Sequence, residues 1–351
     1  MRARAALIVP GSLATRTGGY EYDRRLIAGL TDLGWRIEVH ELDESFPNPT
    51  AAAMDSAARV LARLEAGVPV IVDGLAYGAM PELAAEHARR LKLIALVHHP
   101  LALETGLPRE LALRLEASER RALAVAHHIV VTSGTTARQL EPYGVAADRV
   151  TVIEPGTDPV TTTAASDSKQ LELLCVATLV PRKGYLTLIE ALAGLTDRSW
   201  HLTCVGSGRR DPATAQALRE RVAALGLEGR ITFTGELGAE ALARCHARAD
   251  VFVLATHHEG YGMALTEAIA YGLPIVSTTA GAVPETLPAG AGLLVPPGDV
   301  PALRVALAQV IDEPDTRQRL AEAASAARDR LPTWTQAAAR MAAVLEACSG
   351  R

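Results

Sequence analysis

Short apolar segments alternate with longer amphipathic segments along the whole chain, and this alternation constrains the fold more than any other feature. The apolar segments are rich in Val, Ile and Leu, whereas segments such as 110–126 and 213–226 repeat apolar residues at helical spacing. This pattern is typical of parallel β-sheets covered by α-helices. Eleven strands are many for one open sheet, so the pattern predicts an α/β protein with two doubly wound, Rossmann-like sheets. The predicted strands are 6–10, 36–42, 68–74, 93–99, 128–133, 172–178, 201–206, 230–235, 251–256, 274–279 and 292–297.

Two domains also fit the length of 351 residues and the hydrophobic content of 49%. Pro, Gly, Thr and Ser replace the periodic pattern over 153–170, which predicts a linker with a stiff first part. We therefore expect one domain over 1–158 and a second over 159–332, facing each other across a cleft. The last segment, 333–351, follows Pro332 and is predicted to be a helix at the domain junction that packs back on the first domain. Its apolar face carries Trp334, Met341, Val344 and Leu345.

Charge and composition exclude several classes of protein. A net charge of −5, a pI near 6.1 and 4% aromatic residues argue against nucleic-acid binding. The four cysteines lack paired spacing, so we expect buried thiols and neither disulfides nor a metal site. The N-terminal apolar run is broken by Pro10 and Gly11 and does not resemble a signal peptide. No apolar run approaches the roughly 20 residues that span a bilayer, so we expect a cytoplasmic protein.

Ligands of open parallel sheets bind beyond the carboxyl ends of the strands, and two candidate sites follow strands of the first half. Gly18 and Gly19 precede a predicted helix and either approach a ligand closely or form an ordinary tight turn. His98, at the end of the strand 93–99, either binds a substrate hydroxyl or is a structural histidine. We expect no metal at His98, because no Asp, Glu or His lies near it at the spacing of a ligand set.

Loops after strands of the second half hold further candidates. Arg182 and Lys183 lie between a strand and a helix, where they can bind phosphate oxygens or remain solvated surface residues. Gly206, Gly208 and Gly235 end strands and either present backbone groups to a nucleotide base or form ordinary turns.

The segment EGYGMALTE, 259–267, is the most informative of these sites. Glu259 precedes a glycine turn and Glu267 follows the start of a helix predicted near Met263. A carboxylate accepts two adjacent hydrogen bonds, so each Glu suits the diol of a sugar ring or a ribose. The free N–H groups at the helix start favour a diphosphate between them. Two isolated surface glutamates are the competing interpretation.

Together these motifs resemble the retaining glycosyltransferases of family four (group 1), which have the GT-B fold and use nucleotide sugars. The resemblance covers nearly the whole chain, and the two-glutamate segment is its specific part. It implies that Glu259 and His98 contact the donor sugar, that Lys183 and Arg182 meet the leaving diphosphate, and that Glu267 binds the ribose. It also implies further donor contacts at Gly18, Gly19, Thr178, Gly206, Gly208, Gly235, Gly260, Tyr261, Gly262 and Met263.

The resemblance implies transfer of a hexosyl group from a nucleoside-diphosphate sugar to an acceptor hydroxyl, with retention, without a metal and without a cofactor. Thr178 departs from the family, which often has an arginine there, and Arg182 can supply the charge. A sugar-nucleotide epimerase and a non-catalytic sugar-binding protein are the alternatives. The acceptor, a small molecule, a glycan or a lipid-linked molecule, is not indicated by any motif. Arg114, Arg120 and Arg121 form either a solvated helix face or a peripheral contact with the inner face of a membrane.

Overall fold

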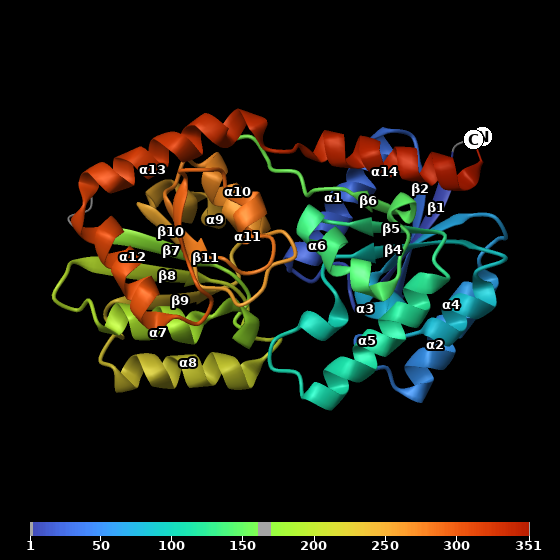
Figure 1. Ribbon diagram of the computed structural model, residues 1–351, viewed down its shortest axis with the longest axis horizontal. Helices are drawn as coiled ribbons and strands as arrows, with labels where there is room; N and C mark the ends of the chain where they lie inside the picture. Colours follow the sequence, from blue (N-terminus) through green and yellow to red (C-terminus); the bar gives the residue numbers. More distant parts are fainter. Residues whose placement is uncertain (1–2, 161–169, 351) are drawn as a thin grey trace. The chain divides into compact units, whose positions relative to one another are not determined.

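The computed structural model describes residues 3–160 and 170–350 and divides into two compact units (Figure 1). The first unit comprises 1–156 and 332–351, and the second comprises 157–331. Each unit is built on a six-stranded sheet in which the paired strands are parallel. The two doubly wound sheets predicted from the sequence are therefore confirmed. Part of the predicted linker, 161–169, lies outside the described residues.

The sheet of the first unit has the strand order β2-β1-β3-β4-β5-β6. Its strands are β1 (Arg4–Pro10), β2 (Arg36–Leu42), β3 (Pro69–Asp73), β4 (Lys92–Val97), β5 (His128–Val131) and β6 (Val150–Val152). The sequence prediction missed β6, because this edge strand has only three residues and all three are partly exposed. Three partly exposed residues do not form an apolar run long enough to be recognised as a strand from the sequence.

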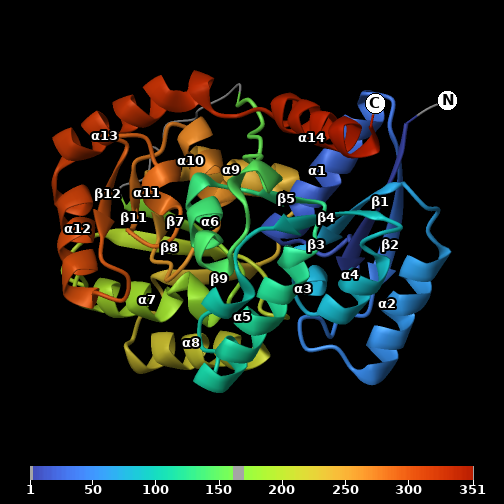
Figure 2. The same cartoon turned by 45° about the vertical axis from the view of Figure 1, so that its right-hand side comes forward.

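Helices cover both faces of this sheet (Figure 2). Alternate strand residues point to opposite faces, so Ile8 and Val72 pack into the core under α2, α4 and α5, whereas Leu7 and Ile71 line the face that meets α1. The helices of this part are α1 (Gly18–Asp32), α2 (Ala51–Arg63), α3 (Gly74–Tyr77), α4 (Pro81–His87), α5 (Arg109–Ala124) and α6 (Gly134–Gln139), with 3-10 turns at Leu101–Leu103, Glu141–Tyr143 and Ala147–Arg149.

The sheet of the second unit has the strand order β12-β11-β10-β7-β8-β9. Its strands are β7 (Leu171–Val176), β8 (Trp200–Val205), β9 (Ile231–Gly235), β10 (Val251–Leu254), β11 (Ile275–Thr278) and β12 (Gly292–Val295). Phe252 and Trp200, both fully buried, belong to a core that runs across the whole sheet.

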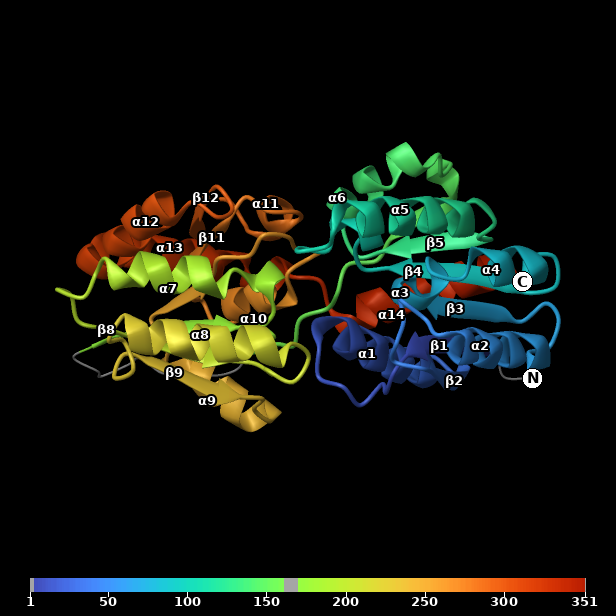
Figure 3. The same cartoon turned by 90° about the horizontal axis from the view of Figure 1, so that it is seen from below.

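Helices α7 and α8 cover one face of this second sheet, and α9 and α10 cover the other (Figure 3). The helices are α7 (Tyr185–Ala193), α8 (Pro212–Ala224), α9 (Ala239–Arg248), α10 (Met263–Ala270), α11 (Val283–Thr286), α12 (Val300–Asp312) and α13 (Pro314–Ala327), with 3-10 turns at Pro181–Lys183 and Arg328–Arg330. The predicted helix start near Met263 is confirmed.

The last helix, α14 (Trp334–Ser349), belongs to the first unit and packs along α1. Its buried face includes Met341, Val344 and Leu345, as the sequence pattern predicts. Trp334 packs against the ring of Tyr22, whose hydroxyl donates to the carbonyl of Ile153 at 2.9 Å.

Within the part of the chain that the structure describes, no helix combines the length and the apolar composition that a bilayer span requires.

Candidate functional site

Sheet topology selects one place in each unit where a ligand is expected. In an open parallel sheet, that place lies beyond the carboxyl ends of two neighbouring strands at which the strand order reverses. These neighbours are β7 and β10 in the second unit and β1 and β3 in the first. Lys183 and Glu259 follow β7 and β10, and Asp73 ends β3.

Hydrogen bonds clamp the loop after β7 to the loop after β10. The backbone carbonyl of Arg182 accepts from the amide of His257 at 2.7 Å and from the hydroxyl of Thr256 at 3.0 Å. The Arg182 guanidinium donates in turn to the carbonyl of His258 at 2.7 Å. Gly184 has a φ of +65°, and a Cβ there would overlap the carbonyl oxygen of Ala255. The basic loop is therefore fixed in place, and it is not a freely solvated surface segment.

Glu259 forms a buried ion pair with the two basic residues of this loop. Its Oε1 lies 2.7 Å from Lys183 Nζ, and its Oε2 lies 3.8 Å from Arg182 Nη1. The exposed fractions of the Glu259, Lys183 and Arg182 side chains are 6%, 17% and 16%. Burial alone favours the neutral form of Glu259, but the charges of Lys183 and Arg182 outweigh burial and hold its pKa below the usual value. One net positive charge remains at this place.

The turn between Glu259 and α10 is fixed from a second side. The Glu259 carbonyl accepts from the amide of Ala282 at 2.9 Å, and the Tyr261 carbonyl accepts from the hydroxyl of Thr286 at 2.6 Å. Gly281 approaches so closely at a φ of +54° that a Cβ would overlap the Glu259 carbonyl. Only Gly260, Tyr261 and Gly262 separate Glu259 from the N-terminus of α10. Met263 and Glu267 lie on the helix itself.

The other candidates of the second unit lie on neighbouring turns. Gly206 donates its amide to the carbonyl of Gly235 at 3.0 Å, and a Cβ at Gly206 would overlap the carbonyl of Ala177, just before Thr178. Tight packing of the turn accounts for Gly206, and a Cβ at Gly208 would meet Ala215 at 2.8 Å. The structure therefore supplies a packing reason for these two glycines that is independent of a nucleotide.

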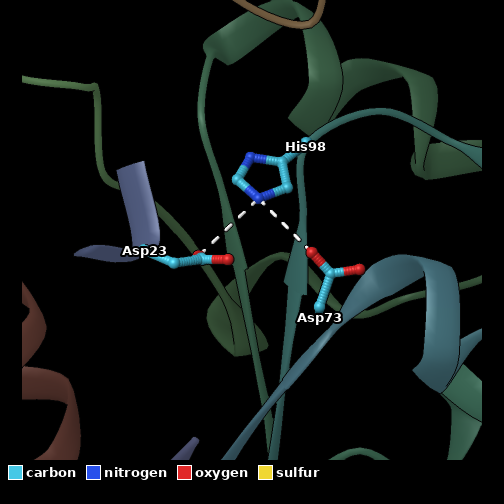
Figure 4. Close-up of side chains that lie close together, drawn as sticks. All are labelled: Asp23, Asp73 and His98. Carbon is cyan, nitrogen blue, oxygen red and sulfur yellow. Dashed lines mark ion pairs between the residues drawn. The ribbon is translucent and has the colours of Figure 1, made fainter. Parts of the chain in front are cut away.

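In the first unit, the structure brings Gly19, His98 and two further acidic residues together. A Cβ at Gly19 would lie 3.4 Å from His98 Nε2, whereas Gly18 is exposed at the start of α1. His98 Nε2 lies 3.6 Å from Asp73 Oδ2 and 3.9 Å from Asp23 Oδ1 (Figure 4). Asp73 shares the sheet face of Ile71, and His98 shares that of Leu96, so both side chains point towards Asp23 on α1.

Asp23 and Asp73 are absent from the sequence prediction. We expected no metal at His98 because no ligand set lies near it in sequence, but these two carboxylates come from α1 and from the end of β3. Asp73 ends a predicted buried strand, so the criterion that selected His98 applies to it equally. Burial lowers the pKa of His98 to about 4. The pKa of Asp23 is raised, mainly by burial and to a smaller extent by the negative charge of Asp73.

The arginines of α5 pair locally. Arg120 lies 2.8 Å from Glu116, and Arg121 pairs with Glu82 of α4, whereas Arg114 is exposed. Exposed pairs of this kind contribute little to stability. Such local pairing is what a solvated helix face would show.

Comparison with known proteins gives the family. A family model described as "Glycosyl transferases group 1" matches residues 162–327, and one described as "Glycosyltransferase Family 4" matches residues 15–160. The chain is 27% identical over 322 residues to an MMP alpha-(1->4)-mannosyltransferase of Mycolicibacterium hassiacum, covering 87% of this chain and 77% of that protein. It is 33% identical over 189 residues to a GDP-mannose-dependent alpha-(1-6)-phosphatidylinositol monomannoside mannosyltransferase of Mycolicibacterium smegmatis, covering 51% of this chain and about half (48%) of that protein.

Solved structures share the fold over the whole length. A sucrose-phosphate synthase from Thermosynechococcus elongatus superposes with a TM-score of 0.82 at 21% identity, covering 99% of each chain. Anabaena HepE in complex with UDP-glucose superposes with a TM-score of 0.77 at 18% identity, covering 98% of this chain and 99% of that one. With both halves matched by family models and the GT-B architecture in common, the chain belongs to the family 4 (group 1) glycosyltransferases.

Proposed function

We propose that this glycosyltransferase moves a hexosyl group from a nucleoside-diphosphate sugar to an acceptor hydroxyl with retention of the anomeric configuration. We propose further that the diphosphate is bound by protein groups, without a metal ion or a cofactor. The name of one relative includes GDP-mannose, and HepE has been crystallised with UDP-glucose, which supports a nucleotide-sugar donor.

The charge balance around Glu259 carries this proposal. Lys183 and Arg182 supply two positive charges and Glu259 one negative charge, in a largely buried place at the strand-order reversal of the second sheet. The free N–H groups and the positive dipole end of α10 add to the attraction for an anion. A diphosphate that engages Lys183 would release one oxygen of Glu259 for a sugar hydroxyl.

The proposed roles follow from these positions. Lys183 and Arg182 stabilise the charge that develops on the departing diphosphate, which is the largest protein contribution in such a reaction. The bond from the anomeric carbon to the diphosphate oxygen breaks, the acceptor oxygen bonds to the same face, and the acceptor proton passes to the diphosphate. Glu259 binds the hydroxyls of the donor sugar, Glu267 binds the ribose, and His98 of the first unit binds a substrate hydroxyl. Arg182 supplies the positive charge that an arginine at the position of Thr178 often supplies in this family.

Calorimetric titration with nucleoside diphosphates, inorganic pyrophosphate and nucleotide sugars tests the donor site. Lys183→Ala removes one charge-assisted contact worth roughly 1.5–3 kcal/mol, so affinity for every diphosphate falls about 10- to 150-fold. Glu267→Gln weakens nucleoside diphosphates but leaves inorganic pyrophosphate unchanged. Glu240→Gln is the matched control, because Glu240 is an exposed carboxylate of α9 that pairs only with Arg244 among the contacts described. Equal affinities for wild type and Lys183→Ala would refute the donor site.

Product analysis separates the classes of function. Anomeric coupling constants in the NMR spectrum of the product report retention or inversion, and an excess of chelator reports whether transfer needs a metal. Isomerisation of the donor without any acceptor would identify an epimerase, and tight binding of a free sugar without turnover would identify a sugar-binding protein. Parallel assays with small-molecule, glycan and lipid-linked acceptors then define the acceptor class. Sedimentation with vesicles of anionic lipid tests the peripheral membrane contact.

A further inference from the structure

Three potential ligand atoms converge in the first unit, whereas the groups proposed to bind the diphosphate belong to the second. Asp23, Asp73 and His98 each offer one atom, and the three atoms lie within 4.8 Å of one another (Figure 4). They come from α1, the end of β3 and the end of β4. Among the residues that the structure describes, this is the one group of His, Cys, Asp and Glu side chains with such geometry.

Asp23 lacks a hydrogen-bond partner although it is buried. Its side chain is 0% exposed and neither carboxylate oxygen accepts a hydrogen bond. His98 Nε2 also has no hydrogen-bond partner, although the His98 side chain is 22% exposed. Seven apolar side chains of α1 and the sheet, among them Leu7 and Leu30, line the cavity behind it. The neighbouring Arg24 turns away to Glu21 and to loop carbonyls. A buried carboxylate in such surroundings costs several kcal/mol unless a cation or a proton compensates its charge.

The spacing of the three groups suits a small divalent ion. Ligand atoms at about 2.0–2.2 Å from a tetrahedral ion lie roughly 3.4 Å apart, and His98 Nε2 lies 3.6 Å from Asp73 and 3.9 Å from Asp23. Asp73 is oriented for this role, because its Oδ1 accepts from the amide of Leu75 at 2.8 Å while its Oδ2 faces His98. An outer hydrogen bond that fixes a ligating carboxylate is characteristic of metal sites.

We propose that Asp23, Asp73 and His98 bind one divalent transition-metal ion of the Zn²⁺ or Mn²⁺ class. An imidazole nitrogen with two carboxylates is a ligand set that such ions accept, and two carboxylates neutralise the charge of the ion. Three protein ligands leave a coordination position for water. This site goes beyond the proposed function, in which Lys183 and Arg182 of the second unit meet the diphosphate.

The test uses tag-free full-length protein that has been stripped with a chelator and dialysed. Titration calorimetry with Zn²⁺ and Mn²⁺ should give one site per chain, and Co²⁺ should give a visible spectrum without the thiolate charge-transfer band that its cysteines would cause. Asp23→Asn and Asp73→Asn should each weaken binding more than about 30-fold. Glu119→Gln is the matched control, because Glu119 is a buried carboxylate of the same unit outside the cluster, and its binding should equal that of wild type.

Circular dichroism and thermal unfolding establish that each variant is folded, and the two Asn variants test the site independently. Nucleoside-diphosphate titration on the same samples separates this proposal from the donor site, since the Asn variants should keep wild-type affinity for the nucleoside diphosphate. No binding of any of the three ions at 1 mM, about the weakest affinity of interest, would overturn the proposal. So would unchanged binding in both Asn variants. A gain of thermal stability in Asp23→Asn without ion binding would identify a proton as the compensating charge, and it also overturns the metal site.

Discussion

Removal of the Lys183 ammonium should destabilise the second unit because it leaves the buried Glu259 carboxylate without its nearest cation. Lys183→Met keeps the aliphatic stem but leaves Glu259, 5% exposed, with Arg182 at 3.8 Å as its remaining cation. Breaking one side of a buried pair typically costs about 3–5 kcal/mol. The residual attraction of Arg182 reduces this, so we expect a loss of roughly 2–4 kcal/mol in the free energy of unfolding. Lys183→Met/Glu259→Gln removes both charges and should recover at least about half of that loss.

The three tryptophans provide an assay specific for one unit. Trp200 lies in β8, whereas Trp35 and Trp334 lie in the first unit. In a Trp35→Phe/Trp334→Phe background, fluorescence during urea unfolding reports the second unit alone, which matters because a two-unit chain need not unfold in one step. The exposed pair Arg244 and Glu240 serves as the control, and the same cycle there should give a coupling below about 0.5 kcal/mol.

A double variant as unstable as Lys183→Met alone would refute this prediction. That result would mean that Glu259 does not depend on Lys183 for its charge, and the argument that a diphosphate releases Glu259 by taking over Lys183 would fall with it. A Lys183→Met variant as stable as the background protein would have the same meaning.

Further predictions concern titration and backbone fit. Glu119 has a pKa raised by burial to about 8 from 4.5, so it is neutral when folded and ionised when unfolded between these values. Stability of the first unit should therefore fall by roughly 3–5 kcal/mol from pH 5 to pH 8 through this group, and denaturation of Glu119→Gln should show a flatter profile. Burial lowers the pKa of His246 to about 4 from 6.5, so the second unit should lose roughly 3 kcal/mol as pH falls through this range; denaturation of His246→Phe should show the loss removed. Gly281→Ala should weaken nucleoside-diphosphate binding and destabilise by more than about 3 kcal/mol, whereas Gly226→Ala, with a φ of +67° and open space, should cost about 1 kcal/mol in the same melting assay.

Much of the fold is predictable because each strand and helix of ordinary length carries its own local signal. The start of α10 follows from the glycine turn before Met263, and its end follows from Gly272 and Pro274. The exception, β6, is held by pairing with β5 and has almost no pattern of its own. Strand order is likewise not a local property, since it depends on which strands pair across the sheet.

The candidate sites also differ in whether their residues share one sequence segment or are brought together by the fold. Glu259 and Glu267 share one segment, so the sequence displays their relation directly. Asp23, Asp73 and His98 lie on three separate elements, and only the parallel register of β3 and β4 and the packing of α1 bring them together. No rule based on sequence spacing can relate residues that lie so far apart in the chain. The bond between Lys183 and Glu259 is of the same kind, because it follows from the pairing of β7 with β10.

The return of α14 to the first unit has a consequence during synthesis on the ribosome. The second unit is one continuous stretch, 157–331, and it emerges complete before α14 does. The first unit begins the chain, yet its α1 face stays uncovered until Trp334–Ser349 has been translated, with Trp334 docking beside Gly156. The usual order, in which the N-terminal domain matures first, is therefore reversed at the last step. A nascent chain halted before residue 334 should hold a finished second unit and a first unit that still exposes apolar surface.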